Sequence, residues 1–500
     1  MLKRNTVFIC SLLLGLPFIG LGIFAPSTLD SVSLRLQTTI IDHFGWGYLL
    51  SVFLFLIFSL FLAFSRYGKL KLGKDYEKPQ YSYFAWFSML FAAGMGIGLI
   101  FWGAAEPLSH FSAPPEQLTA GSRQAARFAM EHSFFHWGLH PWAVYIIMSL
   151  SIAYFSFRRG MPPLVSSCFY PLLGDRIYGW AGRTIDVLAV FATVFGIATS
   201  LGLGALQITS GLTEVTPLQG SRLLTLGIIG VVTVLFMLSS ATGLDTGIQI
   251  LSKTNIILAV LLLLFMLVAG PTSYIMDVFT TTLGGFVSSL VSMSLSTNPF
   301  LGYDWTKDWT LFYWAWWIAW SPFVGLFVAS ISRGRTVREF ILGALLVPSL
   351  LTFLWFAVFG GAAFHLQFEQ GVDIAQAASH DVSTALFQLF AHYPFSNLLT
   401  VLAIVLLLVF FITSADSATY VISMMTSNGN LRPPLAKKLV WGICQSSAAA
   451  ALIFSGGLEG LQRMAIAAAL PFTIVMLFLC LSLLRAMRYE LDVESDTASF

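Results

Sequence analysis

Charge is scarce in this 500-residue sequence, because Asp, Glu, Lys and Arg together make up only 10% of it. The net charge of +2 gives no surplus of either sign that would indicate a nucleic-acid partner or an acidic tail. Cysteine is also rare, and Cys10, Cys168, Cys444 and Cys480 stand far apart, so neither a disulfide framework nor a zinc-binding spacing is visible. With 57% hydrophobic residues, the composition predicts a polytopic protein of the lipid bilayer with no nucleic-acid partner.

Long apolar runs are what the sequence has in abundance. A helix needs about 20 apolar residues to cross a hydrocarbon core roughly 30 Å thick. About twelve segments approach this length, which predicts an all-α protein with twelve transmembrane helices. They lie near residues 7–25, 48–64, 83–104, 133–155, 185–206, 221–243, 250–270, 309–331, 340–362, 396–426, 438–455 and 465–485. No small-residue cleavage pattern follows the first segment, so we expect a span there and not a secretory signal.

Basic residues cluster on one side of these spans. They are Lys3, Arg4, Arg66, Lys69, Lys71, Lys74, Lys78, Arg158, Arg159, Arg333, Arg335, Arg338, Arg432, Lys437, Lys438, Arg485 and Arg488. The positive-inside rule makes that side cytoplasmic, which predicts a cell inner (plasma) membrane protein with both termini in the cytoplasm. Segment 275–297 mixes small polar and apolar residues, and it is either an interfacial helix on the outer face or a plain loop.

Two spans carry irregular sequences. The third contains "FAAGMGIGLIFWG", with glycines at 94, 96, 98 and 103, and the eighth contains Ser321-Pro322 in "WAWWIAWSPFVG". Glycine weakens helices and proline removes a backbone donor, so both spans are predicted to be broken, although close packing and a simple kink are the alternatives. They lie five spans apart, as inverted repeats of five helices require, and paired broken helices indicate a transporter's binding site.

Five motifs together resemble the betaine/carnitine/choline transporter family. They are "GMGIGLIFWGAAEPL", "HWGLHPWAVY", "ATVFGIATSLGLGALQI", "DWTLFYWAWWIAWSPFVGLFVASISRGRTVREF" and "FFITSADSATY", in order within about residues 45–485. The resemblance implies a LeuT-like fold and a homotrimer. The divisions it implies are two N-terminal helices and a cytoplasmic loop in 1–82, a first repeat in 83–272, an outer interfacial helix and loop in 273–308, a second repeat in 309–486, and a short cytoplasmic tail in 487–500.

The resemblance implies a site for a quaternary ammonium group, and the tryptophan-rich eighth span offers the aromatic faces that suit one. Such a cation has no N–H to donate, and aromatic faces attract it by about 0.5–2 kcal/mol each without a buried carboxylate. Trp316, Trp317 and Trp320 have the spacing that brings side chains towards one helical face. The resemblance places the family's aromatic cage on these three residues and on Trp137, Trp142 and Tyr145 in the fourth span. An interfacial aromatic belt is the alternative.

The resemblance also implies how the anionic end of a substrate is held. The unwound backbone near Ala93 and Met95 would approach the carboxylate, because exposed amides and a helix N-terminus favour an anion. Choline-specific members tend to carry an aspartate at the position of Gly98, so its absence favours a zwitterion. Glycine betaine is the first expectation, ahead of carnitine, ectoine, proline betaine or a sulfonium zwitterion. Phe101, Phe312 and Phe327 match gating aromatics of the family.

Sodium is the coupling ion that the resemblance favours, and no other cofactor is expected. Backbone oxygens of Ala92, Met95 and Phe410 and the hydroxyls of Thr413 and Ser414 match one sodium site. Oxygen ligands suit a hard cation, but serine and threonine hydroxyls often bond back to their own helix instead. A second site keeps Thr193 and Phe323, whereas Ile197 replaces an expected hydroxyl. One sodium, a proton, or exchange without an ion therefore stay open.

The remaining ionisable residues inside spans allow two readings each. Asp416 is either a proton relay or coupling residue, or a structural acceptor, and Glu106 is expected at a helix end or along the pathway. His132, His136 and His140 are spaced for a metal, but no further ligand motif supports one, so core or pathway histidines are favoured. No nucleophile, metal set or acid pair of an enzyme is recognisable. A channel is the other rival, but paired broken helices favour a carrier that works by alternating access. Within the carrier class, an osmolyte importer is favoured over a nutrient importer or a substrate exchanger.

Overall fold

The computed structural model describes residues 5–94, 96–242, 245–297, 299 and 304–498. The helices are α1 (Thr6–Phe24), α2 (Pro26–Phe64), α3 (Tyr83–Gly94), α4 (Ile97–Ser112), α5 (Arg123–Trp137), α6 (Leu139–Ala153), α7 (Tyr170–Leu173), α8 (Trp180–Val215), α9 (Arg222–Thr242), α10 (Asp245–Ala269), α11 (Thr272–Ser294), α12 (Asp304–Asp308), α13 (Thr310–Ser330), α14 (Val337–Glu369), α15 (Ile374–His380), α16 (Ala385–Phe390), α17 (Ser396–Met425) and α18 (Leu435–Ala498).

These helices confirm the prediction of an all-α polytopic membrane protein. Helix accounts for 84% of the chain, and the described ranges hold no strand beyond an isolated antiparallel bridge between Lys71 and Thr336. Eleven helices in those ranges are long and apolar enough to cross a bilayer. This number does not map one to one onto the predicted spans, so the count of twelve and the inverted repeats stay predictions.

The differences from the predicted spans have local causes. The third predicted span is divided between α3 and α4, as expected for its glycines, and neither half alone reaches spanning length. The last two predicted spans are the two helical stretches of α18 on either side of Gly457, where φ of 60° and ψ of −137° are not helical, so the interruption falls between them as predicted. The helix that contains the second predicted span, α2, begins at Pro26, far earlier than residue 48, and it continues without a break to Phe64. Segment 275–297 is mostly the helix α11 and not a loop.

The predicted break in the eighth span is wrong, because α13 runs unbroken through Pro322. Proline at this position removes the N–H that would bond the carbonyl of Ile318, one turn earlier. The Ser321 hydroxyl donates to that carbonyl instead, at 2.8 Å. A neighbouring hydroxyl that satisfies the orphaned group lets a buried helix tolerate proline. The sequence-based prediction missed this compensation.

The fourth predicted span contains an interruption that its sequence did not predict. Helix α5 ends at Trp137 and α6 begins at Leu139, because Gly138 between them has φ −97° and ψ −124°. A Cβ atom at Gly138 would lie 2.5 Å from the Phe353 ring and 2.6 Å from the Phe134 carbonyl oxygen. Only glycine fits there without displacing a neighbour, so the break depends on a tertiary contact and not on a local motif.

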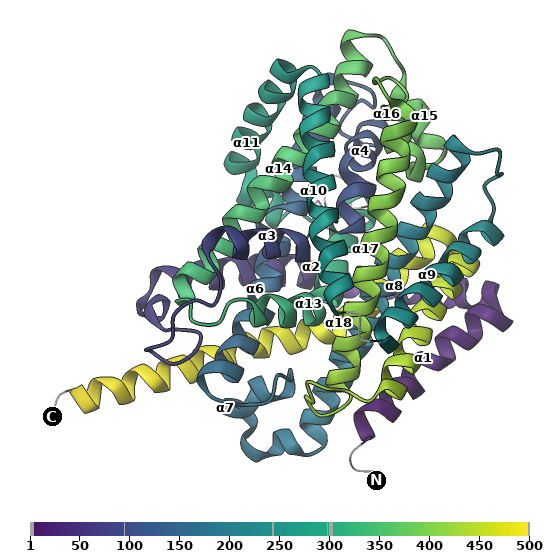
Figure 1. Cartoon of the computed structure of the whole chain (residues 1–500). Coiled ribbons are helices and arrows are strands. Elements are labelled where there is room, and N and C mark those ends of the chain that lie inside the picture. The colour runs from purple at the N-terminus through teal and green to yellow at the C-terminus, as the bar shows by residue number, and fades with distance from the viewer. Residues whose placement is uncertain (1–4, 95, 243–244, 298, 300–303, 499–500) are drawn as a thin grey trace.

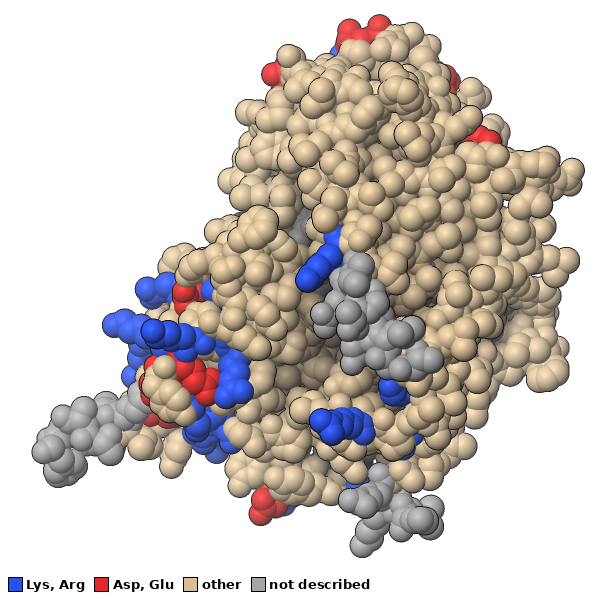
Figure 2. All heavy atoms as spheres, in the orientation of Figure 1, with Lys and Arg blue, Asp and Glu red and all other residues tan. Residues whose placement is uncertain are grey.

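Helix α13 lies at the centre of the bundle, where it packs against α6, α8 and α18. Helices α1 and α11 lie towards the outside of the bundle, and α11 packs on α14 and α5 (Figure 1). Both termini lie towards the lower end in this view. Most visible Lys and Arg side chains gather towards that same end, together with some Asp and Glu, whereas the charged residues visible at the opposite tip are mostly Asp and Glu (Figure 2). This distribution agrees with the charge asymmetry that the sequence shows.

Candidate functional site

Aromatic rings from α13 meet rings from α5 and α6 in the buried centre of the bundle. The ring centroids of Trp137 and Trp317 are 4.9 Å apart, with the planes at 77°. Tyr145 lies 6.1 Å from Trp317 and 6.5 Å from Trp320. All four side chains are at most 5% exposed. An interfacial belt would leave indoles at the lipid boundary, so burial argues against that alternative.

Two further rings complete what we call the aromatic cluster, namely Trp137, Trp142, Tyr145, Trp316, Trp317 and Trp320. Trp316 stacks on Trp317 at 4.7 Å and meets Trp137 edge-on at 6.1 Å. Trp142 meets Tyr145 edge-on at 5.7 Å. Trp314 on the same helix is also buried, but it stacks on His140. The structure thus brings the six predicted cage residues together.

Glycine is required on the face of α4 that adjoins this cluster. A Cβ atom on Gly98 would lie 2.6 Å from the tip of the Trp316 ring and 2.9 Å from the tip of the Trp137 ring. Both distances are shorter than real Cβ contacts allow, so a side chain at this position would force one or both rings to shift. Because Gly98 has no side chain, the rings of Trp316 and Trp137 can occupy their observed positions. Any side chain at position 98 would enter the cluster.

Three polar atoms within the cluster are buried without a hydrogen-bond partner among the described residues. They are the hydroxyl of Tyr145 and the indole N–H groups of Trp316 and Trp320. A buried donor without a partner costs about 1–3 kcal/mol, and native proteins rarely leave one unexplained. Three such donors in one apolar cluster are the groups that an oxygen-bearing ligand would satisfy.

The predicted backbone contacts to an anion are only partly visible. Ala93 and Met95 lie outside the residues whose side chains the structure describes. Helix α4 begins directly after Gly96, which supplies no side-chain cap to the first amides. A Cβ at Gly96 would be 3.9 Å from the tip of Trp320. An uncapped helix N-terminus close to the cluster provides amides and a positive dipole end that favour an anion.

The predicted gating phenylalanines occupy different depths. Phe312 is buried and stacks on Trp316, one turn along α13, with ring centroids 5.6 Å apart. Phe101 is buried on α4 and contacts Trp102 at 4.8 Å. Phe327 lies near the other end of α13 and is partly exposed. These positions leave Phe101 and Phe312 on the far side of the cluster from Phe327, and their gating role stays a prediction.

Three residues of the first predicted sodium site lie on α17. Phe410, Thr413 and Ser414 are partly buried on α17, while Ala92 and Met95 lie outside the residues whose side chains the structure describes. The Thr413 hydroxyl donates to the Val409 carbonyl at 2.8 Å, which leaves its oxygen lone pairs able to face a cation. This back-bond is the one that the alternative reading expects, so the geometry is compatible with both readings.

The second predicted site lies between α8 and α13. These helices approach so closely that a Cβ on Gly196 would be 2.9 Å from the Trp320 backbone nitrogen. The Thr193 hydroxyl donates to Ala189, and Phe323 contacts the Trp320 ring at 5.6 Å. Ile197 is buried and offers no oxygen. Asp416 lies partly buried on α17, shortly after Ser414, and both readings of it stand.

A buried carboxylate beside the aromatic cluster was underestimated from the sequence. Glu106 on α4 is fully buried, and each of its two oxygens lies within hydrogen-bonding distance of two side chains. One oxygen is 2.7 Å from Nδ1 of His136 and 3.2 Å from Nε2 of His110, and the other accepts from Trp137 at 2.6 Å and from Tyr313 at 2.5 Å. A glutamate inside an apolar span was the signal that could have found it.

The three evenly spaced histidines do not form a metal site together. His140 contacts the hydroxyl of Ser294 at 2.8 Å, and His132 contacts the Phe128 carbonyl at 3.1 Å. The ligand atoms that do approach one another are those of Glu106, His110 and His136, within 4.8 Å. The Glu106 oxygen already joins both imidazoles by hydrogen bonds, so a hydrogen-bond network accounts for this group.

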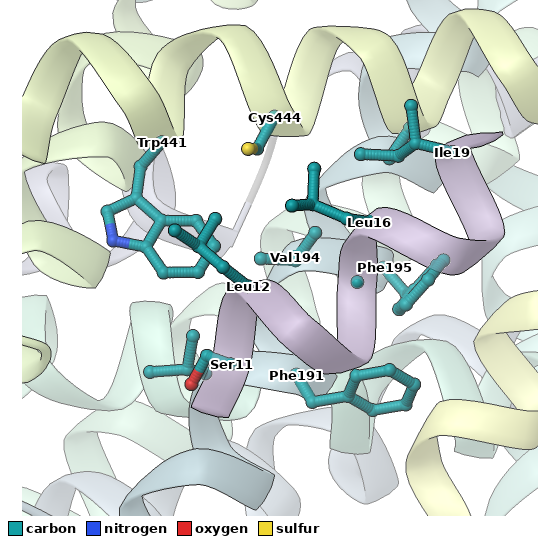
Figure 3. A pocket seen from close by; sticks show the side chains of 12 residues that line it. Ser11, Leu12, Leu16, Ile19, Phe191, Val194, Phe195, Trp441 and Cys444 are labelled. Atoms are coloured by element: carbon teal, nitrogen blue, oxygen red, sulfur yellow. The ribbon is translucent and has the colours of Figure 1, made fainter. Parts of the chain in front are cut away.

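Two hollows lie outside the aromatic cluster. Figure 3 shows an apolar one between α1, α8 and α18, lined by Leu16, Phe195 and Trp441 among others, with a volume of about 10 Å³. That volume holds at most one water molecule and excludes a substrate. A hollow of about 190 Å³ between α5, α11 and α13 includes His132 and Thr310 in its lining. The Thr310 hydroxyl is 2.9 Å from Nε2 of His136, so this hollow adjoins the Glu106 network.

The basic segment after α13 makes an ion pair through Arg333. Arg333 donates from Nε and one terminal nitrogen to the two oxygens of Glu77, at 2.8 and 2.7 Å. These hydrogen bonds lower the pKa of Glu77 below its ordinary value. Arg338 instead donates to the Ala63 carbonyl at 2.8 Å.

The amino-acid sequence is similar to those of known membrane transporters. The family described as "BCCT, betaine/carnitine/choline family transporter" matches residues 6–492. The chain is 51% identical to the glycine betaine transporter OpuD of Bacillus subtilis (strain 168), over 94% of this chain and 91% of that protein. It is 43% identical to the ectoine/hydroxyectoine transporter of Virgibacillus pantothenticus, over 99% and 98%, and 43% identical to glycine betaine transporter 1 of Vibrio parahaemolyticus, over 95% and 92%.

The match covers residues 6–492, so it includes the apolar helices and every residue of the aromatic cluster. Members of the matched family are transporters and not enzymes. The chain belongs to the betaine/carnitine/choline family of membrane transporters.

Proposed function

We propose that this chain imports glycine betaine by alternating access, driven by a sodium gradient. The observation that carries the proposal is the buried meeting of six aromatic side chains from α5, α6 and α13. A trimethylammonium group can neither donate nor accept a hydrogen bond, so a hydrogen-bonding pocket would not hold it. Several ring faces at about 0.5–2 kcal/mol each offset the loss of its hydration.

A zwitterion fits the cluster better than a simple cation does. Gly98 leaves no carboxylate inside the ring cluster, and a side chain there would meet Trp316 and Trp137. The donors of Tyr145, Trp316 and Trp320 that have no partner among the described residues provide hydrogen bonds for a carboxylate. Choline carries a hydroxyl in place of the carboxylate and would leave more of these donors unsatisfied. Carnitine and a sulfonium zwitterion retain both ends and stay alternatives.

The names of the relatives support two related substrates. Two of the relatives described above are named for glycine betaine and one for ectoine and hydroxyectoine. Ectoine carries its positive charge on a ring with N–H groups, which donate hydrogen bonds. The cluster already has three donors without partners among the described residues, so it suits a cation without N–H groups. Glycine betaine is therefore placed first and ectoine second.

Sodium is the proposed coupling ion, transported together with the substrate. Thr413 and Ser414 on α17 supply hydroxyl oxygens, and the Thr413 lone pairs stay available when its proton bonds Val409. Ile197 removes an oxygen from the second predicted site, so we propose a single sodium ion at the α17 site. Proton coupling through Asp416 and exchange without an ion are the alternatives.

We further propose that the protein is a homotrimer of the plasma membrane with both termini in the cytoplasm. The termini lie at the end where Lys and Arg gather, which is the end that the positive-inside rule assigns to the cytoplasm (Figures 1 and 2). A function in osmotic protection would follow from accumulation of a compatible solute.

Substrate competition tests the proposed substrate. The purified protein is reconstituted in liposomes, and initial uptake of radiolabelled glycine betaine is measured with unlabelled betaine, ectoine, carnitine and choline as competitors. We expect saturable uptake, with betaine as the strongest competitor and choline as the weakest. Equal competition by choline and betaine would contradict the zwitterion assignment, and stronger competition by ectoine would replace betaine by ectoine.

A further inference from the structure

The Glu106 network connects directly to the aromatic cluster. Trp137 donates its indole N–H to Glu106 at 2.6 Å, and its ring meets the Trp317 ring edge-on at 4.9 Å. Trp317 donates its own N–H to the backbone carbonyl of His136 at 3.0 Å. His136 in turn lies 2.7 Å from the carboxylate. Two rings of the cluster are thus oriented by one buried group and its immediate neighbour.

The Glu106 carboxyl group is surrounded by groups that can donate hydrogen bonds to it. Its oxygens face the indole N–H of Trp137, the hydroxyl of Tyr313 and the imidazoles of His110 and His136. Each of the four can donate, so these surroundings suit the ionised form of the carboxyl group. The Thr310 hydroxyl at 2.9 Å from the second nitrogen of His136 is consistent with a histidine that donates from Nδ1.

An anion hydrogen-bonded to an indole changes the ring as well as its orientation. The N–H bond to a carboxylate shifts electron density into the indole, because bonded groups in a low-dielectric interior polarise one another. The negative face of the ring, which attracts a cation, becomes more negative. Glu106 is fully buried on α4, so water does not screen this effect. The carboxylate acts on a cation through the ring and need not contact it.

We infer that Glu106 is a positioning residue that orients and polarises Trp137, and that it thereby sets the preference of the site for a cationic head group. This inference rests on the proposed function, because it requires that a quaternary ammonium group occupies the cluster. The Glu106 carboxylate is the negative charge that the ring cluster itself lacks. The carboxylate bonds the N–H edge of the Trp137 indole, so it does not occupy either face of that ring.

The test compares glycine betaine with 3,3-dimethylbutanoate, in which carbon replaces the ammonium nitrogen. The two compounds share shape and carboxylate and differ in the positive charge. Competition against radiolabelled betaine uptake in liposomes gives the affinity of each for the wild type and for Glu106→Gln. We expect the variant to bind betaine about tenfold more weakly and the carbon analogue unchanged, since a polarised ring contributes on the scale of one cation–π contact.

A purely structural role predicts a different result, in which both compounds lose affinity equally. That outcome, or an unchanged preference for betaine, overturns the inference. Asp186→Asn is the matched control, because Asp186 is also a buried carboxylate. It accepts hydrogen bonds from the backbone N–H of Ser166 at 3.0 Å and from the Ser166 hydroxyl at 2.7 Å. We expect this control to keep the wild-type preference. A control that loses the preference equally would also overturn the inference.

A second variant covers the case in which Glu106→Gln does not accumulate in the membrane. Trp137→Phe keeps a ring but removes the donor of the same hydrogen bond, so it should also weaken betaine more than the carbon analogue. An unchanged preference in this variant overturns the inference. If the wild type itself takes up no betaine, the proposed function fails, and that failure is distinct from an unchanged preference in a variant of an active protein.

Discussion

Replacing Gly98 by alanine tests the geometry of the aromatic cluster with a single methyl group. The new Cβ would lie 2.6 Å from the tip of Trp316 and 2.9 Å from the tip of Trp137, so the rings must move. Overpacking by one methyl group in a well-packed interior costs about 1–3 kcal/mol. If the bound state bears this cost, the affinity for glycine betaine falls by roughly fivefold to 150-fold.

Gly96→Ala is the matched control, since it lies two residues away on the same irregular segment. Its Cβ would be 3.9 Å from Trp320, which is an ordinary van der Waals contact. Neither glycine has a positive φ angle, so backbone strain does not separate the two variants. The assay is the concentration dependence of betaine uptake in liposomes, with detergent gel filtration to verify folding. Equal affinities of Gly98→Ala and the wild type would refute the geometry described above.

Three further substitutions have definite expected outcomes. Trp317→Ala removes one ring face and should raise the KM for betaine by roughly twofold to thirtyfold, from about 0.5–2 kcal/mol, and an unaltered KM would refute its place in the cage. Thr413→Ala should shift the sodium concentration needed for half-maximal uptake upwards, whereas identical sodium curves would exclude that hydroxyl as a ligand. Ser321→Ala removes the donor to the Ile318 carbonyl and should lower the thermal unfolding temperature in detergent by a few degrees, from about 1–3 kcal/mol. Ser330→Ala is its control, because that hydroxyl bonds a carbonyl at the exposed end of α13 and its loss should have little effect.

The aromatic cluster could be predicted because its spacing is local. Trp316, Trp317 and Trp320 share a helical face, and that pattern is readable in five consecutive residues. The family resemblance supplied the partners Trp137 and Tyr145, whose contacts with α13 are long-range. The break in the third span was also predictable, since its glycines weaken a helix wherever they occur.

The errors arose where a distant or compensating contact decides the local structure. Ser321 satisfies the carbonyl that Pro322 leaves without a donor, so a proline in a span did not break it. Gly138 interrupts the fourth span because the Phe353 ring occupies the space of a side chain. Glu106 gains its importance from donors on two other helices, α5 and α13, and no local pattern in α4 announces them.

Accumulation of radiolabelled glycine betaine in proteoliposomes, with sodium and proton gradients imposed separately, tests the central claim most directly. The proposed carrier accumulates betaine above the external concentration when sodium is high outside, and a proton gradient alone gives no accumulation. Accumulation driven only by protons would contradict sodium coupling and shift attention to Asp416. Absence of betaine uptake under either gradient would contradict the assignment of the aromatic cluster to this substrate.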